Sequence, residues 1–117
     1  MSSINNKVYF VYSILYRNKC IYIGKTNNIV KRRYQHQTAY RKGADKELYN
    51  YLRSVNYDGS FDLVIIQIFS DEKEAIRYEA FLVLRDYFSG TRQLMQSIPN
   101  ISKYSSKYKK WVFKLNI

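Results

Sequence analysis

Cysteine, histidine, proline and tryptophan each occur only once in this chain of 117 residues. The single cysteine, Cys20, excludes an intramolecular disulfide bond, and the sequence has no cluster of cysteines and histidines that would bind zinc. Cys20 stands inside an apolar run, where a free thiol usually serves as a small core residue. The single proline, Pro99, breaks any regular element at that point of the chain.

Long apolar runs are also missing. No stretch approaches the roughly 20 residues that a helix needs to span a bilayer. The first seven residues, MSSINNK, lack the apolar core of a signal peptide. We therefore expect a protein that works inside a cell, in reducing conditions and without a membrane partner.

Acidic residues are scarce. Nine Asp and Glu residues stand against twenty Lys and Arg residues, which leaves a formal net charge of +11. Such an excess favours a polyanionic partner such as nucleic acid, because each neutralised phosphate releases condensed counterions. The alternative is a basic protein that its charge merely keeps in solution. An apolar content of 46% with thirteen tyrosines indicates a folded chain rather than a disordered one.

β-branched and aromatic residues are concentrated in two runs near the start of the chain. The first run extends from Val8 to Leu15, the second from Cys20 to Ile23, and a polar turn at 17–19 separates them. This pattern predicts a β-hairpin that is cut off at Gly24.

The hydrophobic period then changes from that of a strand to that of a helix. Asn27 or Asn28 can cap this helix, which is predicted to fade at 40–43. Arg32 and His36 are four residues apart and therefore lie on one face of the helix.

Two further helices and one strand are predicted. A second helix is expected from Lys46 to about Val55, with Asp45 as its N-cap. Residues Phe61 to Phe69 are predicted to be a strand. The continuous apolar run at 63–66 predicts that this strand is central in the sheet and buried on both faces. The longest helix is expected from Glu72 to Phe88.

The order strand, strand, helix, helix, strand, helix predicts a small α/β sandwich, in which helices pack on an antiparallel sheet. We expect one domain, residues 1–117, with its core at about 8–100. Residues from about 101 to 117 would form a basic extension rich in aromatic residues. Within it, Trp111–Phe113 is either a short strand or an anchor packed back on the core.

Two tripeptides of the hairpin, Phe10-Val11-Tyr12 and Tyr22-Ile23-Gly24, carry tyrosines that are ten residues apart. Arg32 follows the second tyrosine by ten residues, and His36 follows Arg32 by four. This segment resembles the catalytic domain of the GIY-YIG endonuclease family, whose second half-motif stands here almost intact. The first half-motif is degenerate, since Phe10 replaces its glycine. The resemblance implies a central antiparallel three-stranded sheet flanked by helices, in the order β-β-α-α-β-α.

The resemblance further implies a metal-dependent endonuclease that hydrolyses DNA, with one Mg²⁺ or Mn²⁺ ion per site. Arg32 would hold the phosphate, a task that suits its planar and permanently charged guanidinium. His36 would act as an acid–base group or orient a tyrosine hydroxyl. Tyr12 is the favoured base and Tyr22 the alternative. Because a phenol has an ordinary pKa of about 10, either would need nearby positive charge to act as a base.

Glu79 is the predicted metal ligand. Its neighbours three and four residues away are apolar, and a carboxylate on such a face is costly unless it is paired or binds a metal. The family has a metal-binding glutamate in such a helix, and one suffices because Mg²⁺ keeps most of its waters. The alternative is a surface-edge glutamate paired with a lysine or arginine. Asn100 is the candidate for the family's late asparagine, which supports the active site by hydrogen bonding.

Lysines and arginines in two regions are candidates for contacts with a nucleic-acid backbone. They are Lys25, Lys31, Arg33, Lys107, Lys109 and Lys110. The last three are interleaved with aromatic residues, a pattern that can follow a phosphate backbone while rings stack on bases. The expected partner is DNA, double-stranded or branched, and the protein would be a monomer or a homodimer.

Two other functions fit the same sequence. A catalytically inactive nucleic-acid-binding module would retain the fold and the charge, and the degenerate first half-motif favours it. A structural or protein-interaction domain would bind DNA weakly and lose it near physiological salt.

Overall fold

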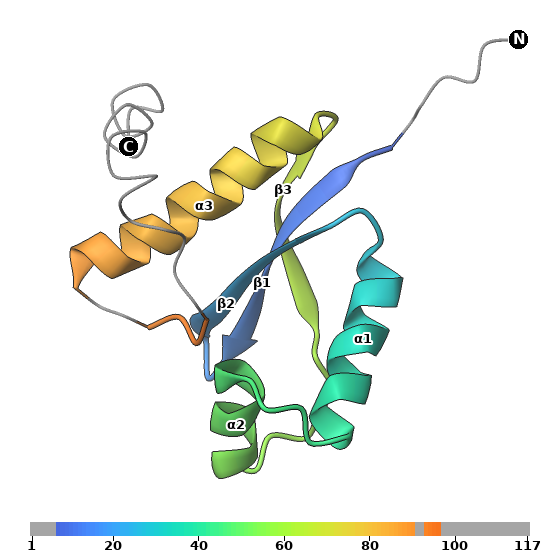
Figure 1. Cartoon of the computed structure of the whole chain (residues 1–117), viewed down its shortest axis with the longest axis vertical. Coiled ribbons are helices and arrows are strands. Elements are labelled where there is room, and N and C mark those ends of the chain that lie inside the picture. Colours follow the sequence, from blue (N-terminus) through green and yellow to red (C-terminus); the bar gives the residue numbers. More distant parts are fainter. Residues whose placement is uncertain (1–6, 91–92, 97–117) are drawn as a thin grey trace, which may run out of the picture.

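The computed structural model describes residues 7–90 and 93–96. Within them, three strands form one antiparallel sheet in the order β2-β1-β3, and three helices pack against it (Figure 1). The predicted fold class, a three-stranded antiparallel sheet flanked by helices in the order β-β-α-α-β-α, is therefore confirmed. The elements are β1 (Tyr9–Tyr16), β2 (Lys19–Thr26), α1 (Ile29–Arg41), α2 (Glu47–Ser54), β3 (Leu63–Phe69) and α3 (Glu72–Ser89).

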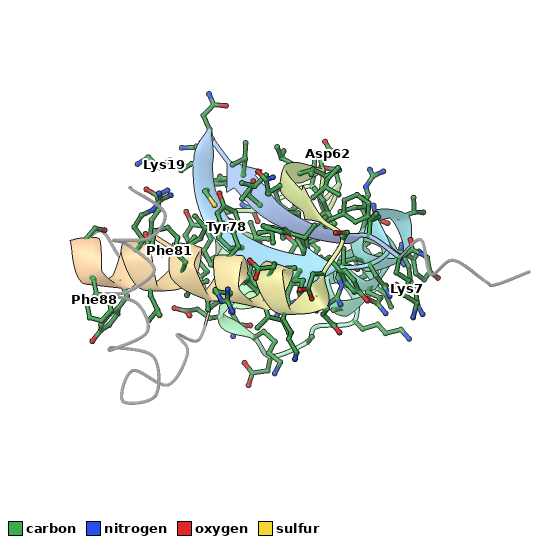
Figure 2. The ribbon with its side chains drawn as sticks, turned by 90° about the horizontal axis from the view of Figure 1, so that it is seen from above. Lys7, Lys19, Asp62, Tyr78, Phe81 and Phe88 are labelled. Carbon is green, nitrogen blue, oxygen red and sulfur yellow. The ribbon has the colours of Figure 1, made fainter. Side chains whose placement is uncertain are left out.

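The helices lie on opposite sides of the sheet, with α3 on one side and α1 and α2 on the other (Figure 1). On the α3 side, Val11 and Ile23 of the sheet belong to one apolar cluster with Phe81 of the helix. Figure 2 labels Phe81 and Tyr78 on this helix. A second cluster fills the layer beneath α1 and α2. Its buried members are Tyr12, Ile14, Ile21, Leu48, Leu52 and Phe61. No helix of the described residues has both the length and the apolar character that crossing a bilayer requires.

β1 is the central strand and β3 lies at an edge of the sheet. The prediction that the apolar run at 63–66 is buried on both faces in a central strand is therefore wrong. Val64 and Ile65 expose 45% and 44% of their surface, whereas residues 11–14 of β1 are all buried. An apolar run does not by itself identify a central strand. Strand order depends on contacts between residues that are far apart in the sequence.

The helix starts show one confirmed cap and one error. Asn28 is the N-cap of α1, and its side chain accepts a hydrogen bond from the backbone N–H of Lys31 at 3.0 Å. The N-cap of α2 is Lys46, so the prediction of Asp45 as its cap is wrong. The carboxylate of Asp45 accepts a hydrogen bond from the side chain of Asn50 at 2.8 Å instead.

A β-bulge in β2 decides where Tyr22 points. The register of the two hairpin strands shifts between Ile14 and Leu15, which leaves Ile21 without a partner in β1. As a result, Ile21 and Tyr22 both contact the cluster beneath α1 and α2. An extra residue in one strand re-aims the side chains that follow it, and here it directs a motif tyrosine toward α1.

Residues 93–96 lie along the outer edge of β2. The backbone N–H of Met95 donates to the carbonyl of Ile21 at 2.7 Å. The side-chain amide of Gln96 bonds both the N–H and the carbonyl of Ile23, at 2.7 and 2.8 Å. These bonds satisfy backbone groups that an edge strand otherwise leaves open, and they hold the strand that carries Tyr22.

Candidate active site

The two halves of the hairpin motif meet where Tyr12 stands opposite Gly24. A Cβ atom at position 24 would overlap the ring and hydroxyl of Tyr12, so only glycine leaves room for that ring. Phe10, which replaces the glycine of the first half-motif, is paired on both sides, with Thr26 of β2 and Ile68 of β3, and the β1–β3 register shifts only beyond it, between Val11 and Tyr12. The replacement therefore leaves the central strand intact.

His36 is held between two tyrosines. Its Nε2 is 2.8 Å from the hydroxyl of Tyr12 on β1, and its Nδ1 is 2.8 Å from the hydroxyl of Tyr49 on α2. The ring of Tyr22 also meets the imidazole edge-on, with centroids 5.5 Å apart. His36 is only 4% exposed. Three elements of the fold thus converge on the single histidine.

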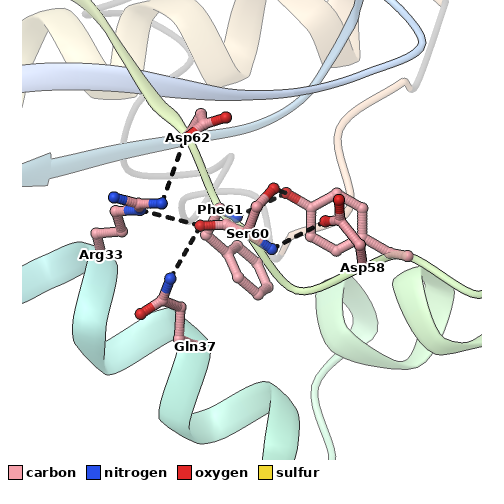
Figure 3. Close-up of polar contacts among 7 residues, drawn as sticks. Arg33, Gln37, Asp58, Ser60, Phe61 and Asp62 are labelled. Atoms are coloured by element: carbon pink, nitrogen blue, oxygen red, sulfur yellow. Dashed lines mark hydrogen bonds and ion pairs between the residues drawn. The ribbon is translucent and has the colours of Figure 1, made fainter.

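The loop before β3 supports the other face of His36. Phe61 is fully buried, and its ring stacks on the imidazole with 5.5 Å between centroids. The backbone of Phe61 is left-handed, with φ of 50°, so the prediction that the strand begins at this residue is wrong. Arg33 and Gln37 of α1 hold the loop by donating to the carbonyl of Ser60, each at 3.0 Å (Figure 3).

Arg32 and Glu79 bring opposite charges to the same pair of tyrosines. Arg32 lies one turn before His36 on α1, and its Nε is buried with no hydrogen-bond partner in residues 7–90 and 93–96. Glu79 lies on α3, and its carboxylate makes no hydrogen bond or ion pair with the part of the chain that the structure describes. Neither the Arg32 Nε nor the Glu79 carboxylate is therefore satisfied by the described residues.

Burial dominates the acid–base properties of these residues. It lowers the pKa of His36 to about 4, and the charge of Arg32 adds to this effect. Burial also raises the pKa of Tyr12 and of Tyr22, and Arg32 only partly offsets this. The pKa of Glu79 is raised by burial as well, with Lys25 and Arg32 acting in the opposite direction. His36 is consequently neutral near pH 7.

The predicted backbone-binding residues of the hairpin and α1 have different surroundings. Lys25 forms an ion pair with Glu72 of α3, with 3.2 Å between Nζ and Oε2. Lys31 is exposed. Arg33 is paired with Asp62 at 3.4 Å while it also holds the loop at Ser60 (Figure 3). Asn100, Lys107, Lys109 and Lys110 lie outside the described residues, as do Pro99 and Trp111–Phe113.

Tyr49 and Phe61 were not predicted as site residues. With thirteen tyrosines in the chain, composition gives no reason to select Tyr49. The only local signal is its position in α2, beside the buried Leu48 and within the same short helix as Leu52. Their roles follow from the packing of α2 and the loop against α1.

A divalent ion fits this site through Glu79. The carboxylate is partly buried and has no partner among the described residues, which also contain no group of three or more His, Cys, Asp or Glu side chains that could enclose a metal. Mg²⁺ is commonly held by one or two carboxylates, with water and substrate phosphate completing its coordination. The donor set therefore suits Mg²⁺ or Mn²⁺ rather than a structural zinc ion.

Comparison with known proteins identifies one family. The family model of the GIY-YIG catalytic domain matches residues 5–86, which include both motif tripeptides, Arg32, His36 and Glu79. No curated protein and no solved structure matches the chain.

Proposed function

Because the chain belongs to the GIY-YIG nuclease family, we propose that it is a metal-dependent endonuclease that hydrolyses DNA phosphodiester bonds. The observation that carries this proposal is the arrangement of Arg32, Tyr22 and Glu79. Among the described residues, the Nε of Arg32 is buried without a hydrogen-bond partner and the carboxylate of Glu79 has none either, and both charges act on Tyr22. Unpartnered polar groups of opposite charge are costly unless a ligand satisfies them.

The residues divide the chemistry between them. The guanidinium of Arg32 binds phosphoryl oxygens and stabilises the charge that develops on them. Glu79 holds the divalent ion, which when bound supplies further stabilisation of that charge. Tyr22 accepts a proton from the water whose oxygen attacks the phosphorus. The bond from phosphorus to the 3′ oxygen breaks, that oxygen takes up a proton, and the product carries a 5′ phosphate.

Burial favours Tyr22 over Tyr12 as the residue that meets water. Tyr12 is fully buried, with 0% of its surface exposed, and its hydroxyl is already bonded to His36. Tyr22 is half-buried. After burial, the charges of Glu79 and Arg32 have the largest effects on its pKa. A general base must come within hydrogen-bond reach of the proton that it removes. The sequence favours Tyr12, and the structure supports Tyr22.

DNA is the proposed substrate because the chain carries a net charge of +11 and belongs to a nuclease family. Lys31 is exposed on α1, next in sequence to Arg32, and is available for a phosphate contact. Lys107, Lys109 and Lys110 remain predicted contacts. A single site of this kind cuts one strand, so the proposed primary product is a nick.

Nicking of supercoiled plasmid tests the proposal. We expect the wild type to convert supercoiled plasmid to open circle with Mg²⁺ but not with EDTA. Glu79→Gln should abolish nicking while DNA binding remains, because the amide retains the shape of the carboxylate but not its charge. Glu74→Gln is the matched control, since Glu74 is exposed on the same helix and pairs with Arg77 at 2.9 Å.

Two results would contradict the proposal. Cutting that survives Glu79→Gln would remove this glutamate from the role of metal ligand. DNA binding without cutting under any metal would favour the catalytically inactive nucleic-acid-binding module, for which the altered first half-motif is the supporting feature.

A further inference from the structure

A row of hydrogen-bonding rings crosses the layer beneath α1 and α2. The hydroxyl of Tyr49 is 2.8 Å from Nδ1 of His36, and Nε2 of the same ring is 2.8 Å from the hydroxyl of Tyr12. The ring of Tyr12 in turn contacts that of Tyr22, with 6.2 Å between centroids. The row therefore leads from α2, through α1 and β1, to the half-buried tyrosine of β2.

The single proton of a neutral imidazole gives this row a direction. One ring nitrogen donates and the other accepts, and the hydrogen bonds decide which is which. If Nε2 carries the proton, it donates to Tyr12 and Nδ1 accepts from Tyr49. If Nδ1 carries the proton, it donates to Tyr49 and Nε2 accepts from Tyr12. The two tautomers send the hydroxyl hydrogen of Tyr12 in opposite directions.

Burial limits the acceptors that the hydroxyl hydrogen of Tyr12 can have. Tyr12 has no exposed surface, so its hydroxyl hydrogen must point at a protein acceptor. Among the described residues, that acceptor is either His36 or Tyr22. A hydrogen bond from Tyr12 to Tyr22 would stabilise the phenolate that the proposed base has to form. It is possible only when Nε2 of His36 donates to the oxygen of Tyr12.

We propose that Tyr49 is a positioning residue, which donates its hydroxyl hydrogen to Nδ1 of His36 and thereby keeps the imidazole proton on Nε2. Tyr12 then accepts from His36 and donates to Tyr22. The row of donated hydrogens runs from Tyr49 to the proposed base and ends there. The consequence for catalysis rests on the proposed function, whereas the tautomer of His36 does not.

The surroundings of His36 contain no carboxylate that would compete for its proton among the described residues that contact it. The groups that face it are Tyr12 on β1, Tyr22 on β2, Arg32 on α1, Tyr49 on α2 and Phe61 in the loop before β3. Arg32 is the only charged group among them, and a cation disfavours protonation of both nitrogens together. The imidazole therefore carries one proton, and its position is the quantity to measure.

Nitrogen-15 NMR of the untagged protein measures that position directly. His36 is the only histidine, so the two imidazole nitrogens give the only histidine ring signals and need no residue assignment. We expect the wild type at pH 7 to show a protonated Nε2 and a bare Nδ1. A protonated Nδ1, or an equal mixture of the two tautomers, would overturn the inference.

Tyr49→Phe then tests the role of the donor. We expect the protonated-Nε2 state to lose its dominance in this variant, because Nδ1 no longer has a hydroxyl donor. The nicking rate at neutral pH should fall about tenfold, the size expected for one hydrogen bond to a group that becomes charged. The rise of the rate with pH should move to higher pH, since the Tyr22 phenolate loses a stabilising donor. An unchanged tautomer or an unchanged pH profile would remove the positioning role from Tyr49.

Tyr40→Phe is the matched control. Its hydroxyl donates to the carbonyl of Tyr57 at 2.8 Å and its ring contacts Phe61, but it lies outside the row. We expect this variant to lose some stability while its tautomer and pH profile match the wild type. A shift in Tyr40→Phe equal to that in Tyr49→Phe would mean that a general loosening of the core, not the row, was responsible.

The two proposals fail separately. The expected tautomer in a protein that never cuts DNA would support the inference and contradict the proposed function. Efficient metal-dependent cutting by a protein with a protonated Nδ1 would support the proposed function and contradict the inference. It would also point to Tyr12, donating to His36, as the base.

Discussion

The ring of Tyr12 occupies the space that a side chain at Gly24 would need. The two residues stand opposite each other in the β1–β2 ladder, and a Cβ at position 24 would overlap both the ring and the hydroxyl of Tyr12. The glycine of the second half-motif therefore serves the tyrosine of the first, since it lets the Tyr12 hydroxyl reach His36. The two halves of the motif form one packing unit.

Gly24→Ala should consequently displace Tyr12 and break its hydrogen bond with His36. We expect a loss of about 1–3 kcal/mol in the free energy of unfolding, as for other overpacked positions, together with loss of nicking. Gly43→Ala is a suitable control: a Cβ at that position meets nothing within 4 Å, although its φ of 78° makes the substitution strained. Denaturant unfolding and plasmid nicking would measure both variants. Full activity in Gly24→Ala would show that Tyr12 does not need its present position.

Arg32→Lys separates bidentate phosphate binding from simple positive charge. Lysine keeps the charge but lacks the planar fork, so we expect DNA affinity to change little. The rate of the chemical step should fall by about 10²–10³, the range found for the loss of one donor to a transition-state oxygen. Single-turnover nicking at saturating protein measures this rate. Arg41→Lys, an exposed change in the last turn of α1, should leave the rate unchanged. If Arg32→Lys cuts as fast as the wild type, Arg32 contributes only its positive charge and not bidentate binding of the phosphate.

His36 makes the stability of the fold dependent on pH. Its pKa is lowered from 6.5 to about 4 by burial and by Arg32, so the unfolded chain binds a proton in this interval while the folded chain does not. The contribution is fully present above about pH 6.5 and is lost as the pH falls through about 4. Linkage puts its size at about 3 kcal/mol.

Melting temperatures of the wild type and His36→Gln between pH 4 and pH 7 measure this contribution. We expect the wild type to lose more stability than the variant on acidification, since only the wild type has an imidazole to protonate. Parallel curves for the two proteins would show that His36 is not buried as the structure describes.

Two isoleucines should differ strongly in what they contribute to stability. Ile14 on β1 is 1% exposed, whereas Ile68 on β3 is 52% exposed. Ile14→Ala should cost about 2–5 kcal/mol of unfolding free energy, and Ile68→Ala less than about 1 kcal/mol. Urea denaturation of the two variants makes the comparison. Similar large losses would mean that β3 is covered on both faces, as its apolar sequence predicts.

Local patterns in the sequence predicted much of the candidate site. The hairpin, the change to helical period after Gly24 and the spacing of Arg32 and His36 are all properties of short segments. Each depends on backbone preferences and on neighbours within a few residues. For the same reason the family match could be expected from the motif alone.

The surroundings of His36 could not be predicted in this way. Tyr12 and Tyr49, which hold its two nitrogens, lie 24 and 13 residues from it in the sequence. Phe61 stacks on it from a loop that follows another helix. The hairpin motif marks Tyr12 but does not show that it reaches His36, and nothing in the local sequence distinguishes Tyr49 and Phe61 from the other tyrosines and phenylalanines of the chain.

The sequence by itself determined the order of the elements, the basic character of the protein and the identities of the motif residues. These depend on composition and on periodicity along the chain. Only the tertiary structure decided that β1 is central, that Tyr12 is buried while Tyr22 is half-buried, and that His36 is neutral. Burial and strand order arise when distant segments pack together, and the cost of burying a charge then sets the pKa of each group.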